Sequence, residues 1–526
     1  MGSTRRTLLT SAAALGATAL TTRPAHARVR LTRESHRVLV IGSGFGGGVT
    51  ALRLAQAGIP VTVLERGRWW PTGPNADTFA TLDQFDRRAL WYGTLPEALR
   101  PLARLGLRPA KLDPYVGVME LVPGINTLPI CGAGVGGTSL IYNSMTIQPS
   151  EAVFNTWLPE GLDYRRMDRV HYPRAATLLK PSGAPDELIA SRTYAVERAF
   201  ADGARRAGHR IEKYPLAIDW AYPMAEVRGE VAPAFTTGEI NFGVNNGGKY
   251  SVDRTYIAQA LSTGNCTVAT HHRVTSVARA RDGRWTVHVD RTDDSGRTVE
   301  QKILTTGSLF VSAGCLNTSR LLVRAKALGH VPDLPDAVGE GYGSNGDRFY
   351  LWTSPLERFG VVQGGPGLHI SKDWTDPRTA TSLTHSPLLG APAGLAGSAF
   401  VWGMGVSPDR GRFTYNGLTD TVDLTFPAGG DRASARVMGR RMAEITRGLG
   451  TLVDLTDVLN GLTAHPLGGA CMEAVTDLEG RVLGQDGLYV MDGSLIPGTA
   501  GACNPSFTIA AVAERALERI VANEEV

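Results

Sequence analysis

Cysteine is scarce in this 526-residue chain, and the few cysteines are scattered. None belongs to a C-x-x-C pair, so neither a redox dithiol nor a cysteine-based zinc site is predicted. The 11 histidines show no zinc-ligand spacing, and the adjacent His271 and His272 would point to opposite faces of a strand. We therefore predict no metal site. An odd number of cysteines leaves at least one free thiol, and a buried free thiol is expected for most of the five, which are Cys131, Cys266, Cys315, Cys471 and Cys503.

Signals for nucleic-acid binding and for a membrane span are also missing. No Lys/Arg cluster with interleaved aromatic residues occurs, and no RNA-binding signature is present. Internal repeats and low-complexity tracts are absent. Beyond the N-terminal region, no segment is long and apolar enough to cross a bilayer. These absences exclude a nucleic-acid partner. The length of the chain is enough for a globular protein of two domains.

The N-terminal residues carry a targeting pattern. Arg5 and Arg6 precede an apolar stretch over residues 8–20, and Ala25-His26-Ala27 fits a small-x-small cleavage site. This order predicts a bacterial twin-arginine (Tat) export signal over residues 1–27, the Tat machinery as a partner, and a secreted or extracytoplasmic protein. The alternative is a chance arginine pair on a disordered leader. The formal net charge of +4 includes the cationic Arg5, Arg6 and Arg23 of this leader, so the remaining chain is close to neutral.

Residues 36–67, HRVLVIGSGFGGGVTALRLAQAGIPVTVLERG, have the pattern of a nucleotide-binding βαβ unit. Residues 38–41 form a short aliphatic run that suits a buried parallel strand. Gly42, Gly44 and Gly47 make a G-x-G-x-x-G turn, in which the glycines permit the tight turn, the approach of a pyrophosphate and close helix packing. Helical spacing follows over residues 49–57, so the helix N-terminus would face the phosphates.

A second strand is predicted over residues 60–64, and Glu65 ends it. An acid at this position is placed to bind the ribose hydroxyls of an adenosine. It indicates an unphosphorylated ribose, as in FAD or NAD. The βαβ unit alone does not distinguish these two cofactors.

The rest of the chain indicates an α/β fold in which the nucleotide domain is discontinuous. Strand patterns recur over residues 266–270, 274–277, 285–289 and 309–313, and the last of them enters Gly314 and a helix. Residues 488–491 read as a buried strand and residues 507–520 as a closing helix. Residues 346–430 have few helix signals. We predict a Rossmann-type FAD-binding domain over 34–75, 112–150, 235–345 and 457–526, with an inserted α+β substrate domain on a mostly antiparallel sheet and covering loops over 76–111, 151–234 and 346–456.

Several motifs, in a fixed order, carry a resemblance to a known family. They are GSGFGG at 42–47, GAGVGGTSL at 132–140, VSAGCLNTSRLLVRA at 311–325, VGEGYGSNGDRF at 338–349, AHPLGG at 464–469, and VMDGSLIPG at 490–498 followed by Asn504-Pro505. Together they resemble the glucose–methanol–choline (GMC) oxidoreductases, and within them the noncovalent cholesterol oxidases of actinobacteria. Without this resemblance the second glycine-rich segment could be an ordinary loop.

The resemblance implies FAD and a set of residues that hold it. Gly42, Gly44 and Gly47 would line the pyrophosphate, Glu65 would hold the ribose, and the backbone of Val274 would meet the adenine. The residues implied to bind the cofactor are Gly42, Gly44, Phe45, Gly46, Gly47, Glu65, Gly134, Gly136, Gly137, Ser139, Asn143, Val274, Gly314, Asp492 and Gly493. Some relatives tether FAD through a histidine at a position that matches the region of Ile141, which cannot form that bond, so noncovalent FAD is predicted.

The same resemblance selects two catalytic candidates whose chemistry fits. Alcohol oxidation removes the hydroxyl proton while hydride passes to the flavin, and an imidazole can accept that proton near neutral pH. His465 is the candidate acceptor, and Asn504 would orient the hydroxyl by hydrogen bonds. Read alone, His465 could be a core histidine and Asn504 a helix N-cap before Pro505. The joint pattern favours the catalytic roles.

Two positions depart from the family pattern. Cholesterol oxidases of this kind have a glutamate that moves the ring double bond, and in the stretch THSPLLGAPAGL at 384–395 its place falls on Pro387. His385, two residues earlier, is a candidate substitute. Tyr142-Asn143-Ser144 stands where relatives have Asn-Gly-Gly. Both departures put isomerase activity and the identity of the substrate in question.

Three interpretations of function follow. The first is a secreted FAD-dependent oxidase of cholesterol, related sterols or other bulky alcohols, which uses O2, makes H2O2 and makes at most peripheral membrane contact to extract its substrate. The second is an oxidase or dehydrogenase of the same family that acts on a non-sterol alcohol in a biosynthetic pathway. The third is a flavin-bearing binding protein without turnover, against which the retention of His465 and Asn504 argues.

Overall fold

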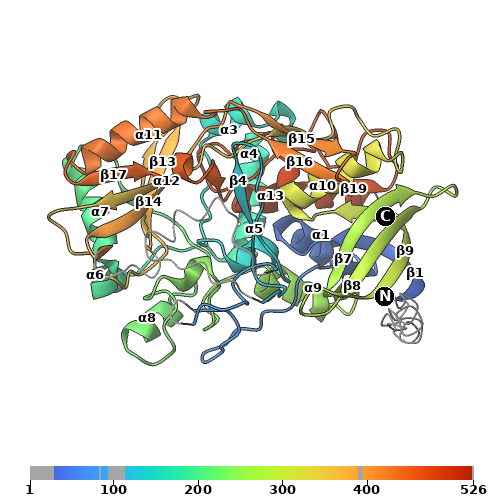
Figure 1. The fold of residues 1–526 in the computed structure, drawn as a ribbon, viewed down its shortest axis with the longest axis horizontal. Helices are drawn as coiled ribbons and strands as arrows, with labels where there is room; N and C mark the ends of the chain where they lie inside the picture. Colours follow the sequence, from blue (N-terminus) through green and yellow to red (C-terminus); the bar gives the residue numbers. More distant parts are fainter. Residues whose placement is uncertain (1–28, 82–83, 93–112, 389–394, 524–525) are drawn as a thin grey trace, which may run out of the picture.

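The computed structural model describes residues 29–81, 84–92, 113–388, 395–523 and 526. Two sheets organise the chain (Figure 1). A mainly parallel sheet with α1 lies at the right of the view, and an antiparallel sheet covered by α7 and α11 lies at the left. The α/β class predicted from the sequence is confirmed. The predicted leader, residues 1–27, lies outside the described residues.

The first sheet has seven strands, and its central strands are parallel. Its order is β6-β2-β1-β9-β8-β7, with β19 beside the C-terminal part of β9. β1 pairs in parallel with β2 and β9, and β7 and β8 extend the sheet as an antiparallel hairpin. The strands are β1 (Arg30–Ile41), β2 (Val61–Leu64), β6 (Cys266–Ala269), β7 (His272–Arg279), β8 (Trp285–Thr292), β9 (Thr298–Val311) and β19 (Leu488–Val490).

Two elements of the predicted βαβ unit begin earlier than expected. The first strand starts at Arg30 rather than at Val38, because the polar residues 30–36 pair in register with the equally polar first half of β9. Because this pairing joins two polar segments that lie far apart in the chain, no apolar run in the sequence marks it. The helix α1 (Phe45–Gln56) starts directly after the glycine turn. Gly47 permits this, since a Cβ there would lie 2.1 Å from the carbonyl oxygen of Gly42.

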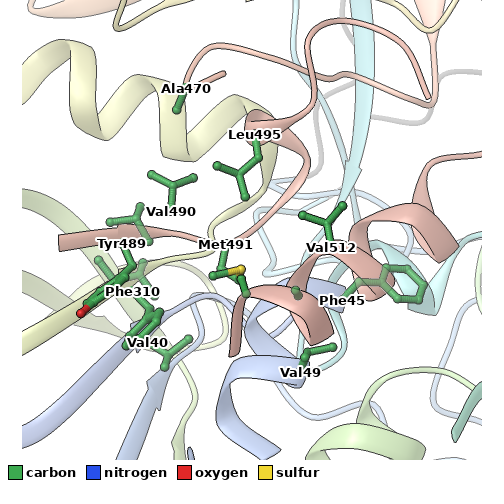
Figure 2. Packing of buried hydrophobic residues seen from close by; sticks show 14 of the residues in the cluster. Val40, Phe45, Val49, Phe310, Ala470, Tyr489, Val490, Met491, Leu495 and Val512 are labelled. Atoms are coloured by element: carbon green, nitrogen blue, oxygen red, sulfur yellow. The ribbon is translucent and has the colours of Figure 1, made fainter. Parts of the chain in front are cut away.

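The helices α1, α13 (Ser506–Ala522) and α10 (Gly314–Ala327) pack on the parallel sheet and form its hydrophobic core. Figure 2 shows Val40 and Phe310 of the sheet beneath Tyr489, with Val49 of α1 and Val512 of α13 close by. The rings of Phe310 and Tyr489 stack with centroids 4.4 Å apart. Because these side chains come from residues 40 to 512, the core joins the two ends of the chain.

The second sheet is antiparallel, as predicted for the inserted region. Its order is β17-β11-β14-β13-β12-β5, and α7 (Ala195–Arg206) packs with α11 (Arg432–Ile445) on one face. The strands are β5 (Glu212–Lys213), β11 (Arg348–Thr353), β12 (His369–Asp373), β13 (Thr381–Ser386), β14 (Ser398–Gly405) and β17 (Thr451–Asp454). Leu383 and Val401 of the sheet join Phe200 and Met438 of the helices in one cluster.

Two smaller sheets connect these layers. One consists of β10 (Glu340–Tyr342), β15 (Gly411–Asn416) and β16 (Thr421–Thr425), and the other of β18 (Leu462–Thr463), β4 (Leu128–Gly132) and β3 (Met119–Leu121). The sequence assigned β15 and β16 to the substrate domain, yet Phe413 and Leu424 belong to the core around the parallel sheet. The reason is their pairing with β10, which local periodicity does not reveal.

Further short helices fill the connections. They include η2 (Gly137–Leu140), α3 (Glu151–Trp157), α4 (Tyr164–Arg166), η4 (Met167–His171), α5 (Tyr172–Leu179), α6 (Asp186–Ala190), α8 (Ala221–Val227), η7 (Asp253–Ile257), α9 (Ala258–Ser262), α12 (Leu455–Val458) and η9 (Gly493–Leu495). None of the helices in the described ranges has both the length and the apolar character needed to span a bilayer. The five cysteines, all within those ranges, are free thiols, and four of them are buried.

Candidate active site

A cavity of about 1030 Å³ runs between the parallel sheet and the antiparallel sheet. This is at the upper end of the usual size for a ligand site, so it can hold a large cofactor together with a second molecule. Of the predicted cofactor residues, those that line it are Gly42, Gly44, Phe45, Gly46, Glu65, Gly137, Asn143, Val274, Gly314, Asp492 and Gly493. His465 and Asn504 line the same cavity.

The glycine turn shapes one wall of this cavity. Gly42 has φ +95°, a conformation that side chains disfavour, and it leads into Gly44, the N-cap of α1. A Cβ on Gly44 would meet no atom within 4 Å, and the same holds for Gly314 at the start of α10. Two helix N-termini therefore border open space, which suits the pyrophosphate of a dinucleotide.

Glu65 lies at the end of β2 and is 5% exposed. Its carboxylate accepts hydrogen bonds from the hydroxyl of Ser43 at 2.6 Å and from the backbone N–H of Gly67 at 2.9 Å. A longer bond from the N–H of Gly134, at 3.3 Å, ties the second glycine loop to the same carboxylate. With a further bond from the backbone N–H of Ser43 at 3.3 Å, the carboxylate accepts four hydrogen bonds, and these fix it at the cavity wall beside the glycine turn.

Most of the second glycine loop lies behind the cavity wall. Gly134, Gly136, Ser139 and also Gly47 of the first loop do not line the cavity. Gly136 donates its N–H to the hydroxyl of Ser43 at 3.1 Å, and Ser139 donates to the carbonyl of Gly136 at 2.6 Å. We infer that these residues support the two glycine loops against each other, while Gly137 and Asn143 form the surface.

Asp492 joins the start of α10 to the loop that carries Gly493. Its Oδ2 accepts from the N–H of Gly314 at 2.8 Å and from the hydroxyl of Thr318 at 2.5 Å, and its Oδ1 accepts from the N–H of Ser494 at 2.8 Å. Burial raises the pKa of Asp492, and the hydrogen bonds it accepts oppose that rise.

The cavity fits FAD by several independent features. Open space lies over Gly44 and Gly314, and Glu65 stands at the position of a ribose ligand. The Oδ1 of Asn143 and the Oγ of Ser312 belong to lining residues and are buried without a hydrogen-bond partner among the described residues. Ile141 also lines the cavity and offers no nucleophile for a covalent link. Among the described residues no three His, Cys, Asp or Glu side chains gather as a metal site would require.

His465 is held at the cavity by Asp347. Its Nδ1 donates to Oδ1 of Asp347 at 2.9 Å, and no described residue forms a hydrogen bond with Nε2. Oδ2 of Asp347 accepts from the hydroxyl of Thr463 and from the N–H of Ala464, both at 2.9 Å. The imidazole also stacks on Trp402, with ring centroids 4.9 Å apart. This arrangement fixes both the orientation and the tautomer of the ring, and it leaves Nε2 free to accept a proton.

Asn504 lies two residues before the start of α13 and does not cap the helix. The cap position is Pro505, which makes no side-chain cap hydrogen bond. The side-chain amide of Asn504 instead donates to the carbonyl of Met145 at 2.6 Å and to the hydroxyl of Ser506 at 2.6 Å. The N-cap interpretation of Asn504 is therefore wrong, and its catalytic role stays a prediction.

One turn, residues 343–347, holds both loops that carry the candidate catalytic residues. Asn345 donates to the carbonyl of Cys503, next to Asn504, and accepts from the N–H of Ala500, both at 2.8 Å. Gly343 exchanges two backbone hydrogen bonds with Leu467 in the loop that carries His465. Asp347, at the end of the same turn, bonds His465 itself.

His385 does not reach the cavity, which corrects the sequence expectation. It is 1% exposed, and its Nδ1 lies 2.5 Å from Oε2 of the buried Glu197 in α7. Oε1 of Glu197 accepts from Nδ1 of His369 at 2.6 Å. Burial would raise the pKa of Glu197, but His385 and His369 lower it to about 2. Pro387, by contrast, lines the cavity.

The remaining cavity wall next to His465 is apolar. Trp402 stacks on Phe349, and Phe349 packs in a cluster with Leu455 and Leu459. The apolar side chains of the whole lining include Phe85, Met119, Leu121, Ile130, Phe242, Phe349, Pro387, Phe400, Trp402, Leu455, Leu459 and Leu462, and polar or charged residues such as Asn241, Arg320 and Arg324 line the cavity as well. A ligand bound here would pack a large hydrophobic part against these apolar side chains, next to His465.

Sequence reasoning missed three residues of this site: Asp347, Asn345 and Ser506. The first two lie in the motif VGEGYGSNGDRF, whose acid and amide between glycines were the available signal. Ser506 lies two residues after Asn504, and no local pattern marked it. The contacts of these three residues depend on partners that are distant in sequence or on where the side chain lies in the folded structure.

Comparison with known proteins gives a consistent result. Residues 8–341 and residues 431–513 match the N-terminal and C-terminal family descriptions of GMC oxidoreductases. A cholesterol oxidase of Mycobacterium tuberculosis is 28% identical over 322 residues, which cover 58% of this chain and 51% of that protein. The match therefore spans only about half the length of that relative.

Other relatives match over most of their length. A cholesterol oxidase of Acinetobacter baumannii is 24% identical, with 92% of this chain and 94% of that protein covered. A 2-methyl-1,2-propanediol dehydrogenase of Mycolicibacterium austroafricanum is 23% identical, with 91% and 94% covered. Among solved structures, pyridoxine 4-oxidase aligns with a TM-score of 0.62 at 15% identity, covering 92% of this chain and 99% of that one. The last similarity concerns the fold alone.

Proposed function

The chain belongs to the GMC oxidoreductases, a family of FAD-dependent flavoproteins that act on the CH–OH groups of alcohols, and we propose that it oxidises the 3β-hydroxyl of cholesterol or a related sterol to the ketone. O2 is proposed as the acceptor and H2O2 as the second product. The similarity to two cholesterol oxidases supports the substrate.

One observation carries this proposal: His465 lies between a nucleotide-binding wall and an apolar wall of the same cavity. Its Nδ1 is held by Asp347, and its ring stacks on Trp402, which continues into the Phe349 cluster. A bulky apolar alcohol would bury its hydrocarbon body against this cluster, since burial of apolar surface is favourable by roughly 25 cal/mol per Å².

The residues divide the work of the reaction as follows. The alcohol loses a proton from oxygen and a hydride from carbon, and bound FAD supplies the hydride acceptor. His465 accepts the hydroxyl proton at Nε2, while Asp347 stabilises the imidazolium through Nδ1. Asn504 orients the alcohol oxygen through its amide. The apolar side chains exclude water and fix the position of the substrate body.

FAD is proposed to bind without a covalent bond. The cavity residue nearest to the family's tethering position, Ile141, has an aliphatic side chain. Affinity would come from the glycine turn, Glu65 and the N-terminus of α10.

Isomerisation of the ring double bond is proposed to be slow or absent. Pro387 lines the cavity where a proton-carrying side chain would be needed, and His385 points to Glu197 instead. The expected product is therefore the unconjugated ketone.

A second candidate function is the oxidation of a non-sterol alcohol of a biosynthetic pathway, with reoxidation by another acceptor. The similarity to 2-methyl-1,2-propanediol dehydrogenase supports it, since that relative matches over nearly the same length as the Acinetobacter protein. The large apolar cavity favours the sterol.

Location is also a proposal. The twin-arginine pattern at Arg5-Arg6 supports export by the Tat machinery, and this route carries folded proteins, which suits a chain that takes up a large cofactor. In that setting the enzyme would touch a membrane only peripherally, to take up its substrate.

The decisive experiment measures peroxide formation with cholesterol, dodecan-1-ol and 2-methyl-1,2-propanediol. We expect peroxide with cholesterol at the highest kcat/KM. Turnover of the diol or the linear alcohol alone would overturn the sterol proposal. Flavin reduction without peroxide would instead exclude O2 as the acceptor.

A further inference from the structure

A serine that no family pattern selects stands inside the active site. Ser506 is the first residue of α13, lines the cavity and is 8% exposed. Its hydroxyl lies 2.6 Å from the amide nitrogen of Asn504 and 3.1 Å from the carbonyl oxygen of Met145. It therefore touches the residue proposed to orient the alcohol.

The surrounding groups fix the direction of every hydrogen bond in this triangle. The carbonyl of Met145 only accepts, so the NH2 group of Asn504 faces it. The N–H of Ile147 only donates, so Oδ1 of Asn504 faces that N–H, at 3.4 Å. Because the carbonyl of Met145 also accepts from Ser506, the serine hydroxyl donates there and accepts the second N–H of Asn504.

Both amide protons of Asn504 are thus engaged before an alcohol binds. One goes to Met145 and the other to Ser506. An alcohol that gives its own proton to His465 needs a donor toward its oxygen, and Asn504 can supply one only by releasing a bond. Met145, Asn504 and Ser506 all line the cavity. The bond to Ser506 is the one released at least cost, because the carbonyl of Met145 then keeps both of its donors, Asn504 and Ser506.

We propose that Ser506 occupies the hydrogen-bond position of the substrate oxygen and thereby sets the affinity for the alcohol. On binding, the second N–H of Asn504 passes from the Ser506 hydroxyl to the alcohol oxygen, while Ser506 keeps its bond to Met145. Ser506 is a positioning residue, and this inference rests on the alcohol-oxidising function proposed above.

The side chain can be removed without loss of a helix cap. Ser506 follows the cap residue Pro505, which makes no side-chain cap hydrogen bond. The hydroxyl of Ser506 bonds Asn504 and Met145 and not the N–H groups of the helix. In Ser506→Ala one N–H of Asn504 has no protein partner in the free enzyme. Binding of an alcohol then no longer displaces a bond, so the dissociation constant should fall by about three- to tenfold, the effect of one ordinary hydrogen bond.

The test is anaerobic reduction of the FAD-loaded enzyme in a stopped-flow instrument, with cholesterol in detergent micelles at increasing concentration. It yields the dissociation constant and the limiting rate of flavin reduction separately. We expect Ser506→Ala and Ser506→Gly to lower the dissociation constant and to leave the limiting rate within about threefold. Ser506→Thr, which keeps the hydroxyl, should retain the wild-type constant.

Thr508→Val provides a matched control. Thr508 is a buried hydroxyl residue of the same helix that bonds Tyr172 and does not line the cavity, so both parameters should stay at wild-type values.

An unchanged or raised dissociation constant in the alanine and glycine variants would overturn the proposal. So would a large fall of the limiting rate alone, since Ser506 would then serve only to hold Asn504. If cholesterol fails to reduce the wild-type flavin, the sterol assignment fails separately, and dodecan-1-ol is used for the same comparison. A wild-type enzyme reduced by neither alcohol would overturn both proposals.

Discussion

Removal of the imidazole of His465 tests the active site most directly. Nε2 of His465 is the free basic atom beside the apolar wall, and Asp347 holds the opposite ring nitrogen at 2.9 Å. Of the other described lining side chains with a titratable oxygen, Glu65 and Asp492 already accept several hydrogen bonds from the protein, and burial raises the pKa of the Tyr142 phenol. We therefore expect none of them to take over the proton.

The expected loss follows from this arrangement. A positioned general base contributes about 10²- to 10⁴-fold to the rate, or roughly 3 to 5 kcal/mol of transition-state stabilisation at 1.36 kcal/mol per tenfold. His465→Ala should therefore slow flavin reduction by that factor. His465→Gln, which keeps a polar side chain at the position but no base, should lose as much. FAD should remain bound in both, because the glycine turn and Glu65 lie at the other wall.

The measurement is anaerobic flavin reduction, followed by the loss of visible absorbance in single turnover. A double-mutant cycle with Asp347→Ala sharpens it. If Asp347 acts only through His465, Asp347→Ala alone lowers the rate by about ten- to a thousandfold but adds less than about threefold in the His465→Ala background. Additive losses, or a reduction rate within tenfold of wild type for His465→Ala, would refute the reasoning.

Three other predictions follow from described features. Acid precipitation should release free FAD into the supernatant, because Ile141 cannot form a covalent link; yellow colour retained in the pellet would contradict this. Cholesterol should give mainly the unconjugated 5-en-3-one at first, because Pro387 carries no proton; appearance of the ultraviolet-absorbing 4-en-3-one in step with peroxide would show that isomerisation survives. Glu197→Gln should lower the free energy of unfolding at pH 7 by about 3 kcal/mol, because lowering a carboxyl pKa from 4.5 to about 2 corresponds to this amount at about 1.36 kcal/mol per pKa unit. Since the pKa of Glu197 is lowered to about 2, its contribution to stability is present above about pH 4.5 and lost as the pH falls towards 2. Denaturant curves of the variant and the wild type should therefore converge near pH 2. A pH-independent difference between them would refute the assignment.

Much of the cofactor wall could be predicted from local sequence. The turn at Gly42–Gly47 and the acid Glu65 need only a strand, a helix and a second strand in succession, and these are encoded within some 30 residues. The structure confirms this α/β unit. The arm of β1 and the packing of β15 and β16 could not be predicted, because each depends on pairing with a segment far away in the chain.

In the candidate site too, local sequence marks some residues, and only the folded structure reveals the others. His465 and Asn504 stand in recognisable motifs, whereas Asp347 and Ser506 gain their roles only from contacts in space. His385 illustrates a second limit. The sequence offers it as a substitute for the missing glutamate only because it lies two residues from Pro387. β13 ends at Ser386, so alternation stops there, and His385 follows Leu383 onto the face that packs on α7 and α11.

The turn at residues 343–347 links the two main sheets and the two loops of the candidate site. It follows β10, which packs with the nucleotide core, and leads into β11 of the antiparallel sheet. Its hydrogen bonds reach the loops of both His465 and Asn504. A rotation of one sheet against the other would therefore break hydrogen bonds of this turn. We expect the turn to hold the two sheets in a fixed relation at the candidate site.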